Sequence, residues 1–290
     1  MRVTYEDLQR PPLDPAALTG ALTGPGSLWR EIEVLADAPS TNALVTERAR
    51  DGEHPGLVVV AEHQTSGRGR LDRAWVTPPR AALTVSFLLS PEGVPAGRWS
   101  WLPLLAGIAV SEAVRRVAEI NCELKWPNDV LVADPSAGSG QGRKLAGILV
   151  ERVERSVGPV AVVGVGLNVA STRAELPVPT ATSLALEGAA TLDRSVILRE
   201  VLRSFAALYL QWQAERGDPS GGLLESYVRR CTTLGRQVRV DLPTGEQVHG
   251  EATGIDADGH LQVRTPRGAR VLGAGDVVHV RSSPDSSVEP

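Results

Sequence analysis

Lysine is nearly absent from this chain of 290 residues, whose 30 basic side chains include only two lysines, Lys125 and Lys144. All the others are arginine. A lysine ammonium is a compact point charge on a slim stem, whereas the guanidinium of arginine is a broad planar fork. Codon bias explains the general scarcity of lysine. The two exceptions raise the question of what an arginine could not do at those positions.

Cysteine is scarce as well. Cys122 and Cys231 lie far apart in the sequence, and neither belongs to a metal-binding or redox pair. They are therefore predicted to be buried free thiols. The five histidines show no close pair and no HExxH motif, so the sequence gives no zinc site.

The chain has no apolar run of about 18 residues, the length that a membrane-spanning helix requires. Its first residues have no apolar core of the secretory type, so we expect a cytoplasmic protein without a membrane partner. The net charge is −4, which gives no basic footprint for DNA or an anionic membrane. Any nucleotide that it binds should be small.

Composition and hydropathy predict two folded units. The apolar fraction of 42% and the charged fraction of 22% are typical of a globular enzyme. Residues 1–28 contain four prolines and predict a lead-in with one short helix. Residues 29–233 form the expected main domain. Residues 234–281 predict a small β-barrel of about five strands, followed by a disordered tail at 282–290.

Apolar periodicity gives the expected elements of each unit. Strands of the main domain are predicted at residues 29–35, 57–61, 82–89, 123–126, 130–133, 145–153 and 160–167. Helices are predicted at residues 40–50, 99–117, 195–213 and 223–230, and Ser40 or Thr41 is available as the first N-cap. The barrel strands are predicted at residues 238–240, 248–252, 261–264, 270–272 and 277–280.

A glycine-rich loop follows the strand at 57–61. It reads Gly-Arg-Gly-Arg at 67–70 and continues to Arg73 and Trp75. Backbone N–H groups of such a loop can approach an anion closely, while guanidinium forks grip carboxylate or phosphate oxygens. The alternative is a solvated basic turn, so this motif alone is only suggestive.

The sequence Lys-Trp-Pro-Asn-Asp at 125–129 combines a cation, an aromatic ring, a turn, an amide and a carboxylate. A turn packed by tryptophan and proline, with its polar residues in water, is the plainer interpretation. The dense mixture directly after an apolar strand favours a functional site.

Two segments resemble nucleotide-binding motifs but lack residues that those motifs require. The Gly-x-Gly at 164–166 has Val169 where a dinucleotide fingerprint requires a third glycine, and the stretch is extended rather than helical. The glycine-rich segment at 138–144 has Arg143 between its glycine and lysine and Leu145 in place of Ser or Thr, so it is no Walker motif.

Taken together, the segments at 40–42, 64–75, 125–129, 144–147 and 166–168 resemble the biotin protein ligase family, in the same order along the chain. The resemblance covers residues 30–210. It implies an α+β fold: a mixed β-sheet flanked by helices, of the class II aminoacyl-tRNA synthetase and biotin ligase type, with a small C-terminal SH3-like β-barrel.

Such ligases join biotin to ATP as biotinyl-5′-adenylate and then pass biotin to one lysine of a biotin carboxyl carrier domain. ATP, Mg²⁺ and biotin are the implied ligands, and carrier domains of biotin-dependent carboxylases are the implied partners. The implied catalytic residues are Lys125, Arg70 and Lys144. The implied biotin-binding residues are Ser40, Thr41, Asn42, Gln64, Gly67, Arg68, Gly69, Arg70, Lys144 and Gly147. The residues implied on the ATP and adenylate side are Arg73, Trp75, Lys125, Asn128 and Asn168.

The metal ligands stay open, because a carboxylate such as Asp129 in a tight turn more often caps backbone amides than binds Mg²⁺. The chain departs from the family pattern at Asp72, where many members have glycine and where the carboxylate has Arg70 and Arg73 as potential partners. It also departs in the long segment at 134–142.

Two other functions are compatible with parts of this pattern. A lipoate or octanoate ligase would keep one central lysine but lack the tryptophan-bearing arginine loop. A biotin-sensing repressor requires a helix-turn-helix before the core, and about 30 residues with four prolines are too few to supply it. The resemblance therefore predicts a ligase that does not bind DNA.

If the two lysines serve chemistry, Lys125→Arg should reduce biotin-dependent ATP–pyrophosphate exchange far more than Arg→Lys changes at surface positions. A guanidinium would crowd the two ligands between which a slim lysine fits. Near-normal exchange by the variant would indicate that the two lysines, like the scarcity of lysine in general, reflect codon bias and not chemistry.

Overall fold

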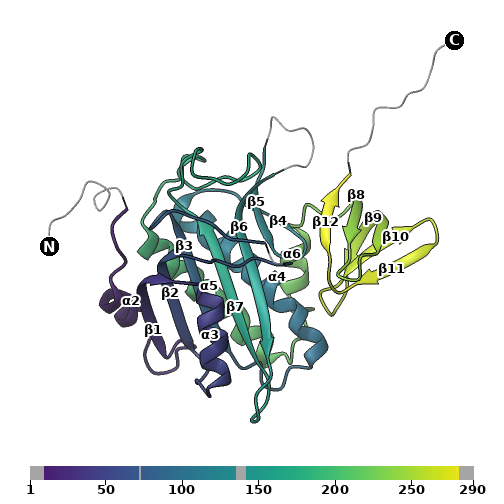
Figure 1. Cartoon of the computed structure of the whole chain (residues 1–290). Coiled ribbons are helices and arrows are strands. Elements are labelled where there is room, and N and C mark those ends of the chain that lie inside the picture. The colour runs from purple at the N-terminus through teal and green to yellow at the C-terminus, as the bar shows by residue number, and fades with distance from the viewer. Residues whose placement is uncertain (1–9, 72, 135–141, 281–290) are drawn as a thin grey trace.

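The computed structural model describes residues 10–71, 73–134 and 142–280. The predicted tail at 282–290, Asp72 and most of the 134–142 segment lie outside the described residues. Two β-sheets organise the chain (Figure 1). None of the described helices is both long and apolar enough to cross a membrane.

The larger sheet has seven strands in the order β1-β2-β3-β7-β6-β5-β4. β1 and β2 are parallel and the other neighbours are antiparallel, so the predicted mixed sheet is confirmed. The strands are β1 (Glu31–Ala38), β2 (Leu57–Gln64), β3 (Ala82–Leu89), β4 (Glu123–Lys125), β5 (Asp129–Val132), β6 (Arg143–Val153) and β7 (Val160–Asn168). The helices are α2 (Pro15–Leu22), α3 (Thr41–Arg50), α4 (Trp101–Ala113), α5 (Arg194–Ala214) and α6 (Leu223–Val228).

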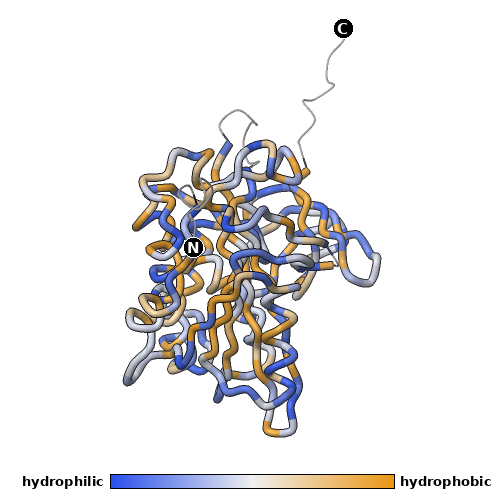
Figure 2. The backbone as a smooth tube through the Cα atoms, turned by 60° about the vertical axis from the view of Figure 1, so that its left-hand side comes forward, coloured by the Kyte–Doolittle hydropathy of each residue, from blue (hydrophilic) through white to orange (hydrophobic). Residues whose placement is uncertain are grey.

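The two faces of this sheet are covered unequally. α4 and α5 cover one face, and the odd-numbered residues Val163, Val165 and Leu167 of β7 join the main core there. On the other face α3 packs over Val160 and Val162, in a smaller apolar cluster. Figure 1 shows α3 in front of the sheet and α4 and α5 behind it, and Figure 2 shows the apolar strands between them. Since α3 has only ten residues, it leaves the rest of its face uncovered.

The start of α3 follows from its capping residue. The Ser40 hydroxyl accepts a hydrogen bond from the Ala43 N–H at 3.4 Å, which satisfies one of the free N–H groups of the first turn. The predicted helix at 40–50 is thereby confirmed, with Ser40 as its N-cap.

The helix predicted over 99–117 is divided. A 3₁₀ turn (Ala96–Ser100) leads into α4, and a π turn (Val114–Ala118) follows it. Pro103 accounts for the later start, because proline is tolerated in the first turn of a helix but would clash with the preceding turn farther inside. Glu119 adopts a left-handed conformation with φ 60° and ends the helix.

The C-terminal sheet contains the five predicted strands, in the order β11-β10-β9-β8-β12. They are β8 (Gln237–Asp241), β9 (Gln247–Ile255), β10 (Leu261–Thr265), β11 (Gly268–Leu272) and β12 (Asp276–His279). β11 and β12 lie at opposite edges and do not pair within residues 142–280, so the expected small barrel is an open antiparallel sheet. An open antiparallel sheet remains consistent with the SH3-like type.

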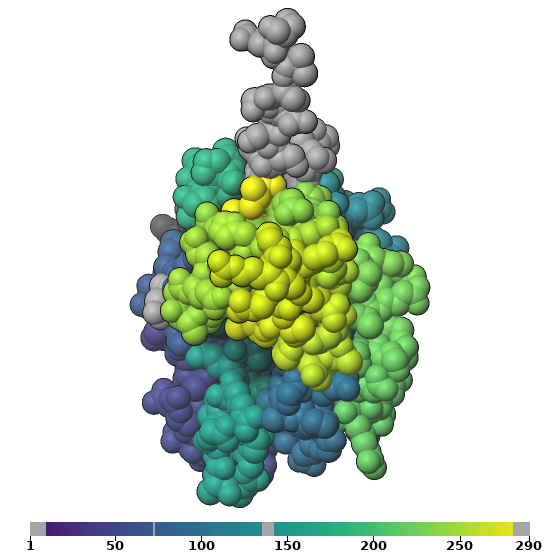
Figure 3. All heavy atoms as spheres, turned by 90° about the vertical axis from the view of Figure 1, so that its right-hand side faces the viewer, coloured from purple at the N-terminus to yellow at the C-terminus, as the bar shows by residue number. Residues whose placement is uncertain are grey.

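Buried indoles join the two units. The Trp126 N–H donates to the Gly259 carbonyl at 3.1 Å, and the Trp101 N–H donates to the Ala257 carbonyl at 2.9 Å. Figure 1 shows the C-terminal sheet beside the larger one, and Figure 3 shows the C-terminal unit in front of the rest of the chain on the face turned to the viewer. Both cysteines are free thiols, as predicted. Cys231 is fully buried, whereas Cys122 is only partly buried. The burial of Cys122 is still enough to raise the pKa of its thiol to about 12.

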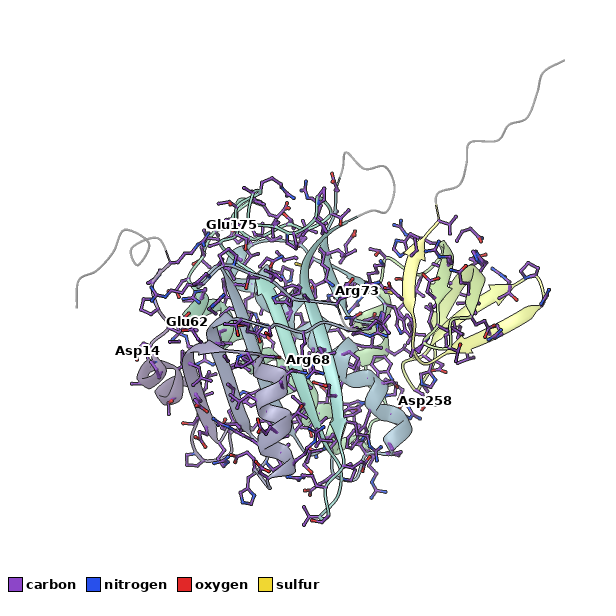
Figure 4. All side chains as sticks on the ribbon, viewed as in Figure 1. Asp14, Glu62, Arg68, Arg73, Glu175 and Asp258 are labelled. Atoms are coloured by element: carbon purple, nitrogen blue, oxygen red, sulfur yellow. The ribbon has the colours of Figure 1, made fainter. Side chains whose placement is uncertain are left out.

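A buried ion pair fixes the N-terminal lead-in. Arg194 lies 2.5 Å from a carboxylate oxygen of Glu62, and the side chains are 4% and 9% exposed. Both also bind the lead-in: Arg194 donates to the Pro11 carbonyl, and Glu62 accepts from the Leu13 N–H. Figure 4 shows Glu62 on the side of the sheet where α2 lies, next to the N-cap Asp14.

We expect Arg194→Ala to lower the free energy of unfolding by about 3–5 kcal/mol, because it leaves the Glu62 carboxylate buried without its counter-ion. Urea denaturation measures the loss. Arg229→Ala is the matched control, since Arg229 pairs with Glu225 at 3.0 Å where both side chains are more than 60% exposed. Its expected cost is at most about 1 kcal/mol. Equal losses in the two variants would contradict an anchoring role for Arg194.

Candidate active site

A cavity of about 460 Å³ occupies the face of the larger sheet that α3 leaves uncovered. Its walls come from α3, the loop after β2, and strands β3, β5, β6 and β7. All the residues singled out in the sequence line it except Gly67 and Lys125. Segments far apart in the chain therefore meet at one place, as the resemblance predicts.

Glycines form the floor of the cavity. Gly166 on β7 is paired in register with Gly147 on β6, so two positions without side chains lie next to each other. The indole of Trp75 lies against them: a Cβ atom at Gly166 would come within 2.4 Å of the ring, and one at Gly147 within 3.3 Å. The Gly-x-Gly sequence thus serves to admit an aromatic ring, not to bind a dinucleotide.

Neutral polar groups line the part of the cavity next to α3. The Gln64 side-chain oxygen accepts from the Thr41 N–H at 2.8 Å, and the Thr41 hydroxyl lies 2.7 Å from the Ser86 hydroxyl. Ser86 in turn donates to the Asn42 side-chain oxygen at 2.8 Å. Thr41, Asn42 and Ser86 are each at most 4% exposed, so these groups offer fixed hydrogen-bonding positions in a water-poor environment.

The arginine loop closes on itself by backbone hydrogen bonds. The Trp75 N–H donates to the Gly67 carbonyl at 2.8 Å, and the Gly69 N–H donates to the Arg73 carbonyl at 2.6 Å. Gly67 is required here, because a Cβ at this position would lie 2.2 Å from the Trp75 carbonyl oxygen. Gly67 therefore shapes the loop without lining the cavity.

Each arginine of the loop has a partner on another element. Arg68 donates to Glu151 on β6 at 3.0 Å, and Arg70 donates to the Asn128 side-chain oxygen at 3.1 Å. Burial lowers the pKa of Arg70. Arg73 forms an ion pair with Asp276 of the C-terminal sheet; Figure 4 shows Arg73 on the side of the loop that faces this sheet.

The two lysines share one charged neighbourhood. Lys144 forms an ion pair with Asp129 at 2.6 Å, and its ammonium lies 5.9 Å from the centre of the Trp75 ring. Burial lowers the pKa of Lys125, as does the positive charge of Lys144, while Asp129 acts in the opposite direction. Lys125 ends β4 beside the cavity without being part of its lining.

Sequence reasoning missed several residues of the site. Thr84, Ser86 and Gly164 lie on the cavity-facing side of β3 and β7. Alternation along the predicted strand at 82–89 could have revealed Thr84 and Ser86, since both point to the face opposite Val85. Asp276 gave no comparable signal, because it belongs to another sheet.

A second cavity of about 600 Å³ lies on the other side of the arginine loop. The turn at 126–128 and Gly259 and Gly273 of the C-terminal unit contribute to its wall. Arg68, Arg70 and Arg73 line both cavities, so the loop is the partition between them.

The carboxylates near the first cavity do not form a metal site. Asp129 and Asp276 are already paired with Lys144 and Arg73. Among the described residues, the metal-type grouping comprises Asp256, Asp258 and His260 in the C-terminal sheet. There the Asp256 carboxylate accepts the backbone N–H groups of the other two residues, as a turn-capping aspartate does.

Comparisons with known proteins agree with this geometry. Residues 34–168 match the Biotin/lipoate A/B protein ligase family, and residues 233–280 match the Biotin protein ligase C terminal domain. The biotin--[acetyl-CoA-carboxylase] ligase of Mycobacterium tuberculosis is 41% identical over 283 residues, which are 96% of this chain and 100% of that protein. The bifunctional ligase/repressor BirA of Escherichia coli is 31% identical over 79% of this chain and 68% of its own length.

A similar solved structure is the biotin protein ligase from Aquifex aeolicus in complex with biotin and ATP. It has a TM-score of 0.70 and 28% sequence identity to this chain, and it covers 88% of this chain and 100% of its own.

The glycine floor makes a direct prediction. Gly166→Ala should displace the Trp75 indole and lower the free energy of unfolding by about 1–3 kcal/mol, the usual cost of overpacking. The chain has six tryptophans, so an NMR spectrum of their indole N–H groups follows the ring, with Trp75→Phe to assign its signal. Gly20→Ala in α2 is the control, because nothing lies within 4 Å of the added Cβ. An unmoved Trp75 signal in Gly166→Ala would refute the packing described above.

Proposed function

Because the chain belongs to the biotin protein ligase family and is an ATP-dependent ligase, we propose a division of labour among the residues of its cavity. The carboxylate of biotin attacks the α-phosphorus of ATP; a C–O–P linkage forms, the bond to the β-phosphate breaks, and pyrophosphate leaves. The biotinyl group then passes to a lysine amine of a carrier domain, and AMP is released. Convergence of neutral donors and acceptors with a set of cations in one cavity is the observation that carries this proposal.

The neutral groups are assigned to the ring end of biotin. Ser40, Thr41, Asn42 and Gln64 come from one short stretch and the adjacent strand end, and they present fixed donors and acceptors in a buried environment. A ureido ring carries one carbonyl acceptor and two N–H donors, which such a set can satisfy together.

The cations are assigned to the reacting groups. A carboxylate that approaches an α-phosphate brings two anions together, so the site must position them and neutralise charge on the phosphate oxygens rather than supply a nucleophile. Lys125, Lys144 and Arg70 surround one turn: Lys125 is paired in register with Asp129, Lys144 forms an ion pair with Asp129, and Arg70 donates to Asn128. Lys125 bridges the carboxylate and the α-phosphate, and Arg70 closes over them from the loop.

Trp75, Asn128, Asn168 and Arg73 are assigned to the adenylate side. The Trp75 indole N–H is buried without a hydrogen-bond partner among the described residues, so it can donate to a ligand atom. The amides of Asn128 and Asn168 donate to the carbonyls of Ile148 and Thr182, which fixes their orientation.

Mg²⁺ enters the proposal as part of the nucleotide substrate. Mg²⁺ commonly keeps several water ligands and is held by substrate phosphates with few protein carboxylates. Since Asp129 and Asp276 are paired with cations, they do not fit a dedicated metal site, and no step is assigned to the metal.

The two free thiols fit a reducing compartment, and we propose a cytoplasmic location.

Biotin-dependent exchange of pyrophosphate into ATP tests the first half-reaction, and labelling of a purified biotin carboxyl carrier domain tests the second. No exchange with biotin would contradict the proposed function. Exchange with lipoate in place of biotin would favour a lipoate ligase on the same fold.

Trp75→Ala should raise the KM for ATP about ten- to a hundredfold, because stacking of a base on an aromatic ring contributes about 1–3 kcal/mol. Trp75→Phe retains a ring and should stay within about fivefold of the wild type. Steady-state exchange kinetics at varied ATP measure both values. An unchanged KM for ATP in Trp75→Ala would show that the nucleotide does not bind against this ring.

A further inference from the structure

Glu151 on β6 links two parts of the site but does not line the cavity. One carboxylate oxygen accepts from the Asn42 side-chain N–H at 2.8 Å, and the other accepts from Arg68 of the loop at 3.0 Å. The Glu151 side chain is 25% exposed. It therefore joins the N-terminus of α3 to the arginine loop behind the cavity.

Glu151 fixes which way the Asn42 amide points. A carboxylate only accepts hydrogen bonds, so Asn42 must turn its nitrogen towards Glu151 and its oxygen towards Ser86. The Leu149 carbonyl, 3.4 Å from the same nitrogen, favours the same orientation. The amide fits here only because residue 164 is a glycine: its oxygen lies 2.0 Å from the place where a Cβ of Gly164 would be.

This orientation extends along the cavity wall. Ser86 has one hydroxyl hydrogen and gives it to the Asn42 oxygen, so towards the Thr41 hydroxyl, 2.7 Å away, Ser86 can only accept. The Thr41 hydroxyl has a second acceptor in the Gln64 oxygen at 3.1 Å. The Gln64 oxygen is held by the Thr41 N–H, which leaves the Gln64 amide nitrogen for other acceptors. One carboxylate outside the cavity thus fixes the orientation of Asn42 and Ser86 in the cavity wall.

We propose that Glu151 is a positioning residue that sets the affinity of the site for the ureido ring of biotin and couples that affinity to the position of Arg68. The proposal rests on the function proposed above. Its selectivity follows from chemistry: a ligand with one carbonyl and two N–H groups requires donors and acceptors in fixed places. The residues assigned above to the adenylate side are not part of this wall, so we expect nucleotide binding to be independent of Glu151.

Glutamine at position 151 tests this assignment with nearly unchanged size. A glutamine has one acceptor oxygen and one donor nitrogen, so it cannot accept from both Asn42 and Arg68 through separate atoms. Its N–H₂ group would face one of these two donors. The conflict is relieved when the Asn42 amide flips, and a flip reverses the pattern that the ligand meets.

We expect Glu151→Gln to raise the KM for biotin about tenfold, the effect of losing one charge-assisted hydrogen bond. The KM for ATP and kcat should stay within about twofold, and Glu151→Asp, which keeps both acceptor oxygens, should recover part of the biotin affinity. Glu154→Gln is the matched control: it makes the same charge change at a side chain that is 70% exposed and paired with Arg152. Pyrophosphate exchange at varied biotin and ATP, with thermal unfolding of each variant, gives these values.

A double variant separates positioning from general packing. If Glu151 acts through Asn42, adding Glu151→Gln to Asn42→Ala should change the KM for biotin by less than about twofold. Independent, multiplicative effects would overturn the proposal, as would a Glu151→Gln variant that behaves like Glu154→Gln. Parallel increases of both KM values with a lowered melting temperature would also overturn it. Absence of biotin-dependent exchange in the wild-type protein would instead refute the proposed function.

Discussion

The site depends on a patch of sheet without side chains. Gly147, Gly164 and Gly166 leave room above β6 and β7 for the Trp75 indole and the Asn42 amide, both of which approach closer than any Cβ would allow. A sheet that carried ordinary side chains here would be filled like the neighbouring region under α3. The cavity therefore lies where the helical layer formed by α3 ends, and the backbone of β6 and β7 forms part of its wall.

Opposite charges hold the arginine loop and its surroundings in place. Arg68 and Arg73 are paired with Glu151 and Asp276, and Lys144 is paired with Asp129. An anionic ligand must share these cations with their present carboxylates, so ligand binding and loop position are linked. Asp276 brings the C-terminal sheet into this linkage and makes that unit part of the site rather than an appendage.

Much of the fold and of the site could be predicted from the sequence. The strand at 82–89, the hairpin at 145–167 and the Ser40 cap depend on local patterns that survive in the folded chain. The open arrangement of the C-terminal sheet could not be predicted, because whether its two edge strands pair depends on how the whole sheet twists and packs. Glu151 and Asp276 escaped notice for the same reason: a carboxylate on a strand looks solvated until its partners are known.

The sequence by itself determined the chemical groups of the site and the elements that carry them, because capping, alternation and turn formation act over a few residues. Only the tertiary structure decided which glycines face the cavity, which carboxylate orients Asn42, and that Lys125 and Lys144 both lie next to Asp129. Those outcomes depend on how far α3 covers its face of the sheet and on contacts between segments up to about two hundred residues apart, such as Arg73 and Asp276. No local pattern encodes such distances, since they are fixed only when the layers pack.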